Sequence, residues 1–260
     1  MTSTFTIDDL GLTAFDACSL SDLGEDMLMA RFDNKYVLHK SILPYILSAL
    51  PNYYKILEID NLRHFGYNSA YFDTPDLKCY LDHHNKRKNR YKFRSRLYED
   101  SGISFFEIKH KNNKGFTEKE RIDLPKFEET ITSEMAAFLK DHTPYDPTQL
   151  FHSLKVRYKR ITLVHKEEER RITIDTDLSF QRDSRFFDYQ DLVIIEVKQE
   201  DPKPFLPLVN LFKKYKIYPL RISKYCVGII NVYPDIKHNN YKQKLRKLRN
   251  IESYGASIIG

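Results

Sequence analysis

Short strand-like runs dominate the chain after about residue 28, and they limit the possible folds more than any other feature. The runs are rich in Tyr, Phe, Ile and Val and are separated by turn residues. They cover Leu28–Leu38, Tyr53–Ile59, His64–Phe72, Tyr91–Tyr98, Ile103–Lys111, Phe116–Leu124, Leu154–Val164, Arg171–Leu178 and Leu192–Lys198. The connections Asp100–Gly102 and Asn112–Gly115 are as short as β-hairpin loops, so we expect the strands that flank each of them to be antiparallel.

Helical periodicity is confined to a few segments between and after these runs. These segments are Lys40–Leu50, Asp76–Asn85, Ser133–Leu139, Phe205–Tyr215 and Tyr241–Asn250. Many strands with few helices predict an α+β chain built on an antiparallel barrel with flanking helices. With only eight glycines and eleven prolines there is little material for a linker, so we expect one compact unit from about residue 28 onward.

The strands place charged residues on one face and apolar residues on the other, because successive side chains of a strand point to opposite sides. In Leu192–Lys198, for example, Val193, Ile195 and Val197 share a face, and Glu196 and Lys198 lie on the opposite one. The other charged residues that share a face are Glu107 with Lys109, Arg94 with Arg96, Lys119 with Arg121, and Arg171 with Asp175.

Two architectures can account for this alternation. In an ordinary sheet the charged face points to water, and Ser, Gln and Asn are then as acceptable there as charged residues. Here the polar positions are overwhelmingly Arg, Lys and Glu, which favours a closed barrel with its apolar face under outer helices and its charged face inside. Burying many unpaired cations costs several kcal/mol each. We therefore expect a water-filled lumen that binds a polyanion.

Composition excludes several other classes of protein. A chain of 260 residues can bury one large core without disulfides. Its three cysteines are too far apart for a zinc knuckle, and this cysteine usage is typical of a protein in the reducing cytoplasm. The longest apolar runs, such as Leu192–Ile195, are far shorter than the ~18 residues of a membrane helix. The acidic first 30 residues argue against a secretory signal. A net charge of +6 permits an anionic partner. We therefore predict a cytoplasmic protein.

Nine motifs follow one another in a characteristic order. They are Arg31–Tyr36, Tyr71–Thr74, Arg94–Tyr98, Phe106–Lys109, Glu118–Arg121, Tyr158–Arg160, Arg171–Thr176, Ile195–Lys198 and Arg221–Tyr225. Each motif is weak alone, but the series resembles the catalytic domain of the vacuolar transporter chaperone (VTC) polyphosphate polymerases and their prokaryotic relatives. That family belongs to the triphosphate tunnel metalloenzymes, or CYTH-like superfamily. The resemblance covers about residues 28–232.

The resemblance implies an eight-stranded antiparallel β-barrel, the triphosphate tunnel, which extends polyphosphate with the γ-phosphate of ATP. It divides the chain into an N-terminal arm of unassigned role (1–28), a VTC-like tunnel domain (29–236) and a basic C-terminal helix and tail (237–260). The implied catalytic cations are Lys35, Arg94, Arg96, Lys109, Arg160, Arg171 and Lys198. The implied substrate-binding residues are Arg221, Lys224, Arg31, Lys119 and Arg121. Glu196 and Glu107 are the implied ligands of a divalent metal, Mn²⁺ rather than Mg²⁺.

One departure from the family pattern bears on the reaction. Relatives that hydrolyse triphosphates open the first strand with Glu-x-Glu-x-Lys, whereas this chain has Arg31, Asp33 and Lys35 there. The difference favours a polymerase, with ATP and polyphosphate as partners and a separate membrane protein if the product is exported. A triphosphatase and a non-catalytic polyphosphate-binding module are the alternatives. We expect neither zinc nor nucleic acid. The alternative role for Glu196 and Glu107 is that of counter-ions in salt bridges.

Two basic runs, Lys86–Arg90 and Lys242–Arg249, have no assigned role. Such runs are most often solvated helix faces, but at a tunnel mouth they would attract ATP or guide an acidic chain. His83 and His84 lie on a helix that we expect to be exposed, so we expect both imidazoles to be solvated.

Overall fold

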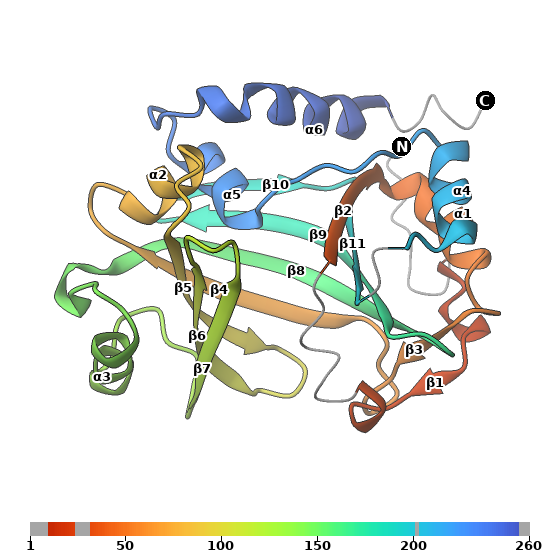
Figure 1. Cartoon of the computed structure of the whole chain (residues 1–260), viewed down its shortest axis with the longest axis horizontal. Helices are drawn as coiled ribbons and strands as arrows, with labels where there is room; N and C mark the ends of the chain where they lie inside the picture. The colour runs from red at the N-terminus through yellow and green to blue at the C-terminus, as the bar shows by residue number, and fades with distance from the viewer. Residues whose placement is uncertain (1–9, 24–31, 201–202, 255–260) are drawn as a thin grey trace.

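The computed structural model describes residues 10–23, 32–200 and 203–254, and a single eleven-stranded sheet runs through it (Figure 1). Eight strands form a continuous path in the order β2-β11-β9-β8-β4-β5-β6-β7, to which β1, β3 and β10 are added. The strands are β1 (Ala17–Cys18), β2 (Phe32–His39), β3 (Tyr54–Leu57), β4 (Phe65–Asp73), β5 (Arg90–Tyr98), β6 (Ser104–Lys111), β7 (Thr117–Leu124), β8 (Phe151–His165), β9 (Arg170–Arg182), β10 (Arg185–Tyr189) and β11 (Leu192–Gln199). Along the path, neighbouring strands are antiparallel.

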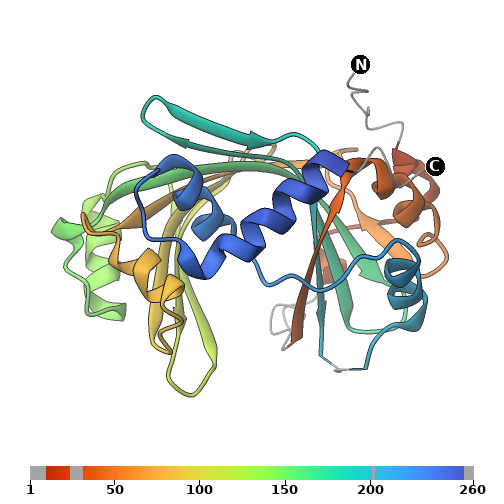
Figure 2. The same ribbon diagram turned by 90° about the horizontal axis from the view of Figure 1, so that it is seen from above.

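The sheet curves strongly but does not close through its backbone. One limb consists of β5, β6 and β7, and the other consists of β2 and β11. Both limbs extend to the same side of β8 and β9 (Figure 2). Within the described residues β2 and β7 end the path, and no ladder joins them. The edge of β2 instead meets the segment before α5, because the Leu220 N–H donates to the Lys35 carbonyl (2.7 Å). The predicted α+β fold with a large antiparallel sheet is therefore confirmed, while closure of an eight-stranded barrel is not seen.

Within the part of the chain that the structure describes, six α-helices flank the sheet. They are α1 (Leu43–Ser48), α2 (Lys78–His84), α3 (Ser133–His142), α4 (Leu206–Lys214), α5 (Lys224–Val232) and α6 (Lys242–Tyr254). The sequence predicted helices over parts of five of them and missed α5, whose Val and Ile residues are typical of strands. The Ser223 side chain caps α5 by accepting the Cys226 N–H (3.3 Å). In the described residues no helix combines the length and apolarity needed to cross a membrane.

The convex face of the sheet is apolar and lies under α1, α4 and α3. Val193, Ile195 and Val197 are buried in one cluster with residues of α1 and α4. Phe106 and Ile108 are buried in a second cluster with residues of α3. The alternation in the sequence thus assigned the apolar faces of β11 and β6 correctly, and it leaves their charged residues on the opposite, concave face.

The concave face is charged over only part of its length, because α5 covers the rest. Leu192 and Ile194 share the face of Glu196, and they are buried in a cluster with Tyr225 and Val227 of α5. Seven of the nine residues of α5 are buried. The predicted charged lumen is therefore bounded at one end by an apolar helix.

Asp73, at the end of β4, ties together the elements around this helix. Its buried carboxylate accepts N–H groups from Thr74 (2.8 Å), Cys79 (2.8 Å) and Tyr80 (3.0 Å), and it also accepts the Tyr225 hydroxyl. Burial nevertheless raises the pKa of Asp73. The carboxylate thus joins β4 and α2 to the first turn of α5.

The expectation that His83 and His84 are solvated is wrong. His84 is 1% exposed, and its carbonyl accepts the Asn240 side-chain amide (3.0 Å), since the segment before α6 packs on α2. Burial, followed by the positive charges of Lys92 and Arg90, lowers the pKa of His83 to about 2.

The close packing of α5 can be tested at Gly228. A Cβ atom there would lie 2.5 Å from Phe180 Cδ1 and 2.6 Å from Leu154 Cδ2. Gly to Ala in a helix normally stabilises by about 1 kcal/mol, whereas overpacking costs about 1–3 kcal/mol. We expect Gly228→Ala to lower the free energy of unfolding measured in urea, and Asn250→Ala, at an exposed position of α6, to leave it nearly unchanged. Equal or greater stability of Gly228→Ala would contradict this packing.

Candidate functional site

The first charged group of the concave face lies where β2 pairs with β11. Lys35 and Glu196 are register partners, and their Nζ and Oε1 atoms are 3.0 Å apart. Lys198, two residues along β11, places its Nζ 3.6 Å from the same oxygen. Burial alone would raise the pKa of Glu196, but Lys198 and Lys35 hold it far below its usual value. Glu196 is therefore an anion between two cations.

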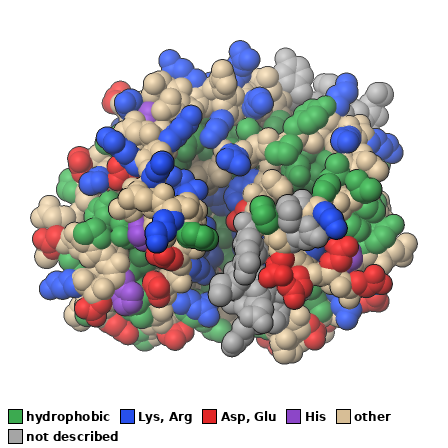
Figure 3. Space-filling view, viewed as in Figure 1, with side chains coloured by type: hydrophobic (Ala, Val, Ile, Leu, Met, Phe, Trp, Pro, Cys, Tyr) green, Lys and Arg blue, Asp and Glu red, His purple; other side chains and the backbone are tan. Residues whose placement is uncertain are grey.

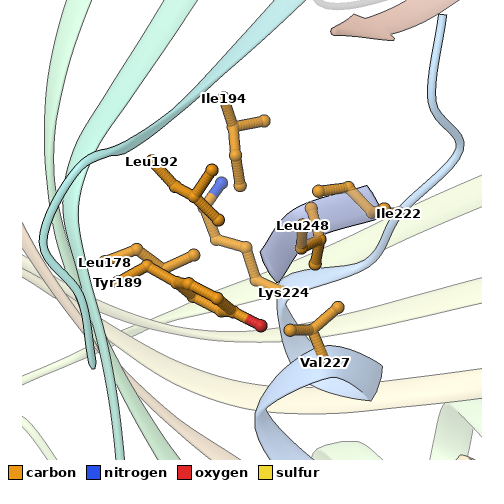
Figure 4. A pocket seen from close by; sticks show the side chains of 8 residues that line it. All are labelled: Leu178, Tyr189, Leu192, Ile194, Ile222, Lys224, Val227 and Leu248. Carbon is orange, nitrogen blue, oxygen red and sulfur yellow. The ribbon is translucent and has the colours of Figure 1, made fainter. Parts of the chain in front are cut away.

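The second group joins β8, β9 and the first residue of α5. Arg160 and Asp175 are register partners and form a two-pronged ion pair, with N–O distances of 2.6 and 2.9 Å. The Lys224 amine contacts the same carboxylate, which is 1% exposed. Figure 4 shows the path of the Lys224 side chain: its stem leaves α5 among apolar side chains such as Leu192 and Ile194. The apolar part of the concave face thus guides a cation into the charged part.

The third group surrounds Glu107, on β6. Its carboxylate is 2% exposed and contacts Arg94, Lys119 at 2.5 Å and Arg96 at 3.8 Å. Burial would raise the pKa of Glu107, but the surrounding cations hold it well below its usual value. Breaking such a buried pair by removing one partner costs about 3–5 kcal/mol.

Tyrosines hold the arginines in place. The Tyr71 hydroxyl accepts Arg94 Nη1 (3.1 Å), and the Tyr158 hydroxyl accepts Arg96 Nη2 (3.2 Å). The rings of Tyr67 and Tyr158 stack with centroids 5.0 Å apart, and the guanidinium of Arg160 lies over both. Hydrogen bonds and cation–π contacts fix the guanidinium groups without neutralising their charge.

The groups from the two limbs face one another across the lumen. Although water reaches Lys109 of β6, the surrounding protein and the charges of Lys92 and Arg94 lower its pKa to about 8. Lys35 and Glu196, on the opposite limb, also act on this amine. In the space-filling view, Lys and Arg side chains gather around a hollow in the middle of the molecule (Figure 3). The structure therefore brings together cations that the sequence spreads over eight segments.

Arg171 has a distinctive position in this set. It lies on β9 opposite Lys198, and burial together with the charge of Arg160 lowers its pKa. Its Nε atom is buried, and the described residues offer it no hydrogen-bond partner. This guanidinium therefore keeps one N–H group without a partner among the described residues.

Lys92, Asp175 and Ser223 were not predicted as site residues. Lys92 is on the face of Arg94 and Arg96, so the alternation of β5 extended by one step would have found it. Its Nζ donates to Ser223 Oγ (2.9 Å), the atom that also caps α5. Asp175 carries the opposite charge to a phosphate-binding residue, and nothing in the sequence marks the contact with Lys224.

Some predicted residues lie at the margin of the site. Arg121 is exposed on β7 and stacks over the Phe105 ring at 4.5 Å. Arg221 is exposed just before α5, and its charge acts on Lys244 of α6. Arg31 lies outside the described residues. For these residues the substrate-binding role stays a prediction.

The described residues contain no cluster of three or more His, Cys, Asp or Glu residues that could hold a metal by itself. Asp33 and Glu196 lie on neighbouring strands, and the charge of Glu196 adds to the desolvation that raises the pKa of Asp33. Mg²⁺ and similar ions commonly use one or two carboxylates and take their other ligands from phosphates and water. This pair fits such an ion. Glu107 is surrounded by three cations, which favours its role as a counter-ion.

The family model of the VTC domain matches residues 30–233. The chain belongs to the VTC-domain family. Among curated proteins, no sequence matches the chain significantly. The match spans β2 to α5, the elements that carry all three charged groups of this VTC domain.

Solved structures extend the likeness at the level of fold. A Hippeastrum protein, described as a candidate adenylyl cyclase with a dominant triphosphatase activity, is 15% identical with a TM-score of 0.51, over 80% of this chain and 99% of its own. A candidate adenylate cyclase from Bacillus halodurans is 16% identical with a TM-score of 0.46, over 75% and 94% of the two chains. Another, from Vibrio parahaemolyticus, is 12% identical with a TM-score of 0.44, over 76% and 98%.

The lowered pKa of Lys109 predicts a pH dependence of anion binding. Its folded pKa of about 8 lies below the usual 10.5, so the amine loses its charge as the pH rises through about 8. We expect the affinity for inorganic tripolyphosphate to fall by about fivefold across this range, the value of one exposed charge contact. In Lys109→Arg the guanidinium keeps its charge, and the fall should disappear.

Titration calorimetry between pH 7 and pH 9.5 measures the affinity of the wild type and of Lys109→Arg for tripolyphosphate. The ionisation of tripolyphosphate affects them equally, so the ratio of their affinities isolates Lys109. A ratio that stays constant with pH would contradict the lowered pKa.

Proposed function

We propose that this VTC domain is a polyphosphate polymerase that transfers the γ-phosphoryl group of ATP to a phosphate chain bound on the concave face. The excess of cations there carries the proposal. The cations are Lys35, Lys92, Arg94, Arg96, Lys109, Lys119, Arg160, Arg171, Lys198 and Lys224, and the carboxylates are Asp33, Glu107, Asp175 and Glu196. The cations outnumber the carboxylates by more than two to one, which suits a ligand with repeated negative charge.

The two kinds of cation have different roles. The planar guanidinium groups of Arg94, Arg96 and Arg171 match pairs of phosphate oxygens. The compact ammonium groups of Lys109 and Lys198 supply point charges along the chain. We propose that side chains of the two limbs, together with the segment before α5, enclose the tunnel around the bound anion.

In the proposed reaction a terminal oxygen of the bound chain attacks the γ-phosphorus of ATP. The bond from that phosphorus to the oxygen of the β-phosphate breaks, ADP leaves, and the chain is one phosphate longer. Phosphoryl transfer depends on positioning and charge stabilisation rather than on a protein nucleophile. Lysine and arginine side chains from both limbs hold donor and acceptor in line and neutralise their repulsion.

The ion pairs favour a phosphate acceptor over water. Glu107, Asp175 and Glu196 are each held by at least two cations, and a carboxylate with a depressed pKa is a weak base for activating water. A terminal phosphate already carries negative charge on its attacking oxygen and needs no base. The replacement of Glu-x-Glu-x-Lys by Arg31, Asp33 and Lys35 also favours a phosphate acceptor over water.

A divalent metal, Mn²⁺ rather than Mg²⁺, completes the proposal. Glu196 and Asp33 would hold it together with phosphate oxygens, and when bound it would neutralise charge on the bridging oxygens. We propose a cytoplasmic site of action, and export of the product would require a separate membrane protein.

Turnover of ATP with Mn²⁺ tests the proposal directly. We expect long phosphate chains, resolved by gel electrophoresis, and ADP in equal amount to the phosphate incorporated. Lys198→Ala removes one charge from the lumen and should reduce product by roughly 100-fold, the effect of losing one electrostatic stabiliser. Lys213→Ala, on exposed α4, is the matched control. Free phosphate as the sole product would identify a triphosphatase, and ATP binding without turnover a binding module.

The role of Glu196 as a metal ligand is tested by Glu196→Gln. Loss of the Glu196 negative charge frees Lys35 and Lys198. We therefore expect the variant to bind tripolyphosphate about fivefold more tightly in the absence of metal. We also expect the Mn²⁺-dependent gain in affinity to be lost, whereas Glu118→Gln on exposed β7 keeps it. If Glu196→Gln still shows the full Mn²⁺-dependent gain, Glu196 is a counter-ion only.

A further inference from the structure

The fold places the two basic runs of the sequence side by side, although some 150 residues separate them. The end of α2 and the start of α6 meet here: the Tyr80 hydroxyl donates to the Lys237 carbonyl (2.6 Å), and the Asn240 amide donates to the His84 carbonyl (3.0 Å). The rings of His84 and Tyr241 stack between them with centroids 6.1 Å apart. The junction is therefore packed and fixed.

Basic side chains cover this junction. We call the set the basic strip, and it consists of Lys86, Arg87, Lys88, Arg90, Arg221, Lys242 and Lys244. Lys86 and Arg221 both lower the pKa of Lys244, after the effect of burial, so the two ends of the strip lie near the same amine. Arg90 Nη1 donates to the Arg87 carbonyl (2.6 Å), which fixes the turn that presents Arg87.

The strip is continuous with the lumen. Arg90 begins β5, whose concave residues Lys92, Arg94 and Arg96 line the site. Lys92, Arg90 and Lys109 all act on His83 at the end of α2, so the lumen cations and the first cation of the strip surround one side chain. Positive charge therefore runs without a break from the site to the outer surface. Figure 1 places α6 along the upper edge of the molecule, and in the same orientation Figure 3 shows Lys and Arg side chains along that edge.

Carboxylates are absent from the sequence segments that build the strip. Residues 83–98 and 237–251 contain no Asp or Glu. A solvated helix face normally alternates its charges, whereas these two segments contain no carboxylate to offset the repulsion between their neighbouring cations. That arrangement is favourable when a polyanion supplies the missing charge.

We propose that the basic strip binds the part of a polyphosphate chain that extends beyond the lumen and guides it over α2 and α6. This inference rests on the proposed function. A chain held at both the lumen and the strip dissociates more slowly than one held at the lumen alone, because release of one part leaves the other bound.

The chemistry of the strip favours polyphosphate over other polyanions. Single-stranded RNA binds through bases stacked on exposed aromatic rings, but Tyr91 and Tyr241, two aromatic residues beside the strip, are buried. An anionic membrane surface engages an exposed apolar face next to the basic one, whereas Leu248 of α6 is buried and Leu245 and Ile251 pack on the core. A chain of phosphates needs neither feature.

Binding of ligands of different length to the full chain tests the inference. The double variant Lys86→Gln/Lys244→Gln removes two neighbouring charges of the strip, and Lys213→Gln/Lys214→Gln removes two exposed charges of α4 as the matched control. Calorimetry measures the Kd of long-chain polyphosphate and of tripolyphosphate for each protein. We expect the strip variant to bind the long chain roughly 25-fold more weakly, because each of the two charge contacts contributes about fivefold, and to bind tripolyphosphate as the wild type does.

The salt dependence gives a second measurement. The slope of log affinity against log salt concentration should be smaller in the strip variant by about one to two for the long chain, and unchanged for tripolyphosphate. Unchanged long-chain affinity in the strip variant, with tripolyphosphate still bound, overturns the inference and leaves the proposed function intact. Absence of tripolyphosphate binding by the wild type refutes the proposed function itself. An equal loss of affinity for a single-stranded RNA homopolymer also overturns the inference, because the strip is then a general polyanion surface.

Discussion

Repulsion between cations on the concave face is the constraint around which this VTC domain is built. Ten lysines and arginines converge there, and the protein holds them with few carboxylates, three of which are each shared by two or more cations. Glu107 serves three cations, while Glu196 and Asp175 serve two each. Sharing keeps each carboxylate charged and the cations fixed, yet leaves net positive charge in the lumen. Tyr71 and Tyr158 hold two arginines without neutralising them.

The helix α5 connects this charge to the rest of the fold. Its buried face packs against the apolar part of the concave face, and Asp73 anchors its first turn through Tyr225. Lys224, at its first residue, reaches Asp175 across the lumen. Packing of an apolar helix thus determines the position of a charged group in the site, and the sheet can remain open at β2 because the segment before α5 covers that edge.

Strand parity predicted the architecture well because it is a local property of the backbone. Val193 and Glu196 fall on opposite faces wherever the strand lies, so the sequence alone separated the convex face from the concave one. The pairing of Lys224 with Asp175, and the contact of Lys92 with Ser223, depend on where α5 docks, and no local pattern encodes that. The Val and Ile residues of α5 are β-branched and therefore typical of a strand, but tertiary packing makes the segment a helix. His84 was placed in solvent for a similar reason, since its covering segment comes more than 150 residues later.

The Ser223 hydroxyl links the helix α5 to the charged site through two hydrogen bonds. One oxygen accepts the Cys226 amide at the start of α5 and the Lys92 amine in the lumen. The Ser223 Oγ atom therefore contributes both to the start of α5 and to the position of a lumen cation. A substitution of Ser223 therefore changes the capping of α5 and the position of the Lys92 amine together, and the two can be changed separately only at other residues.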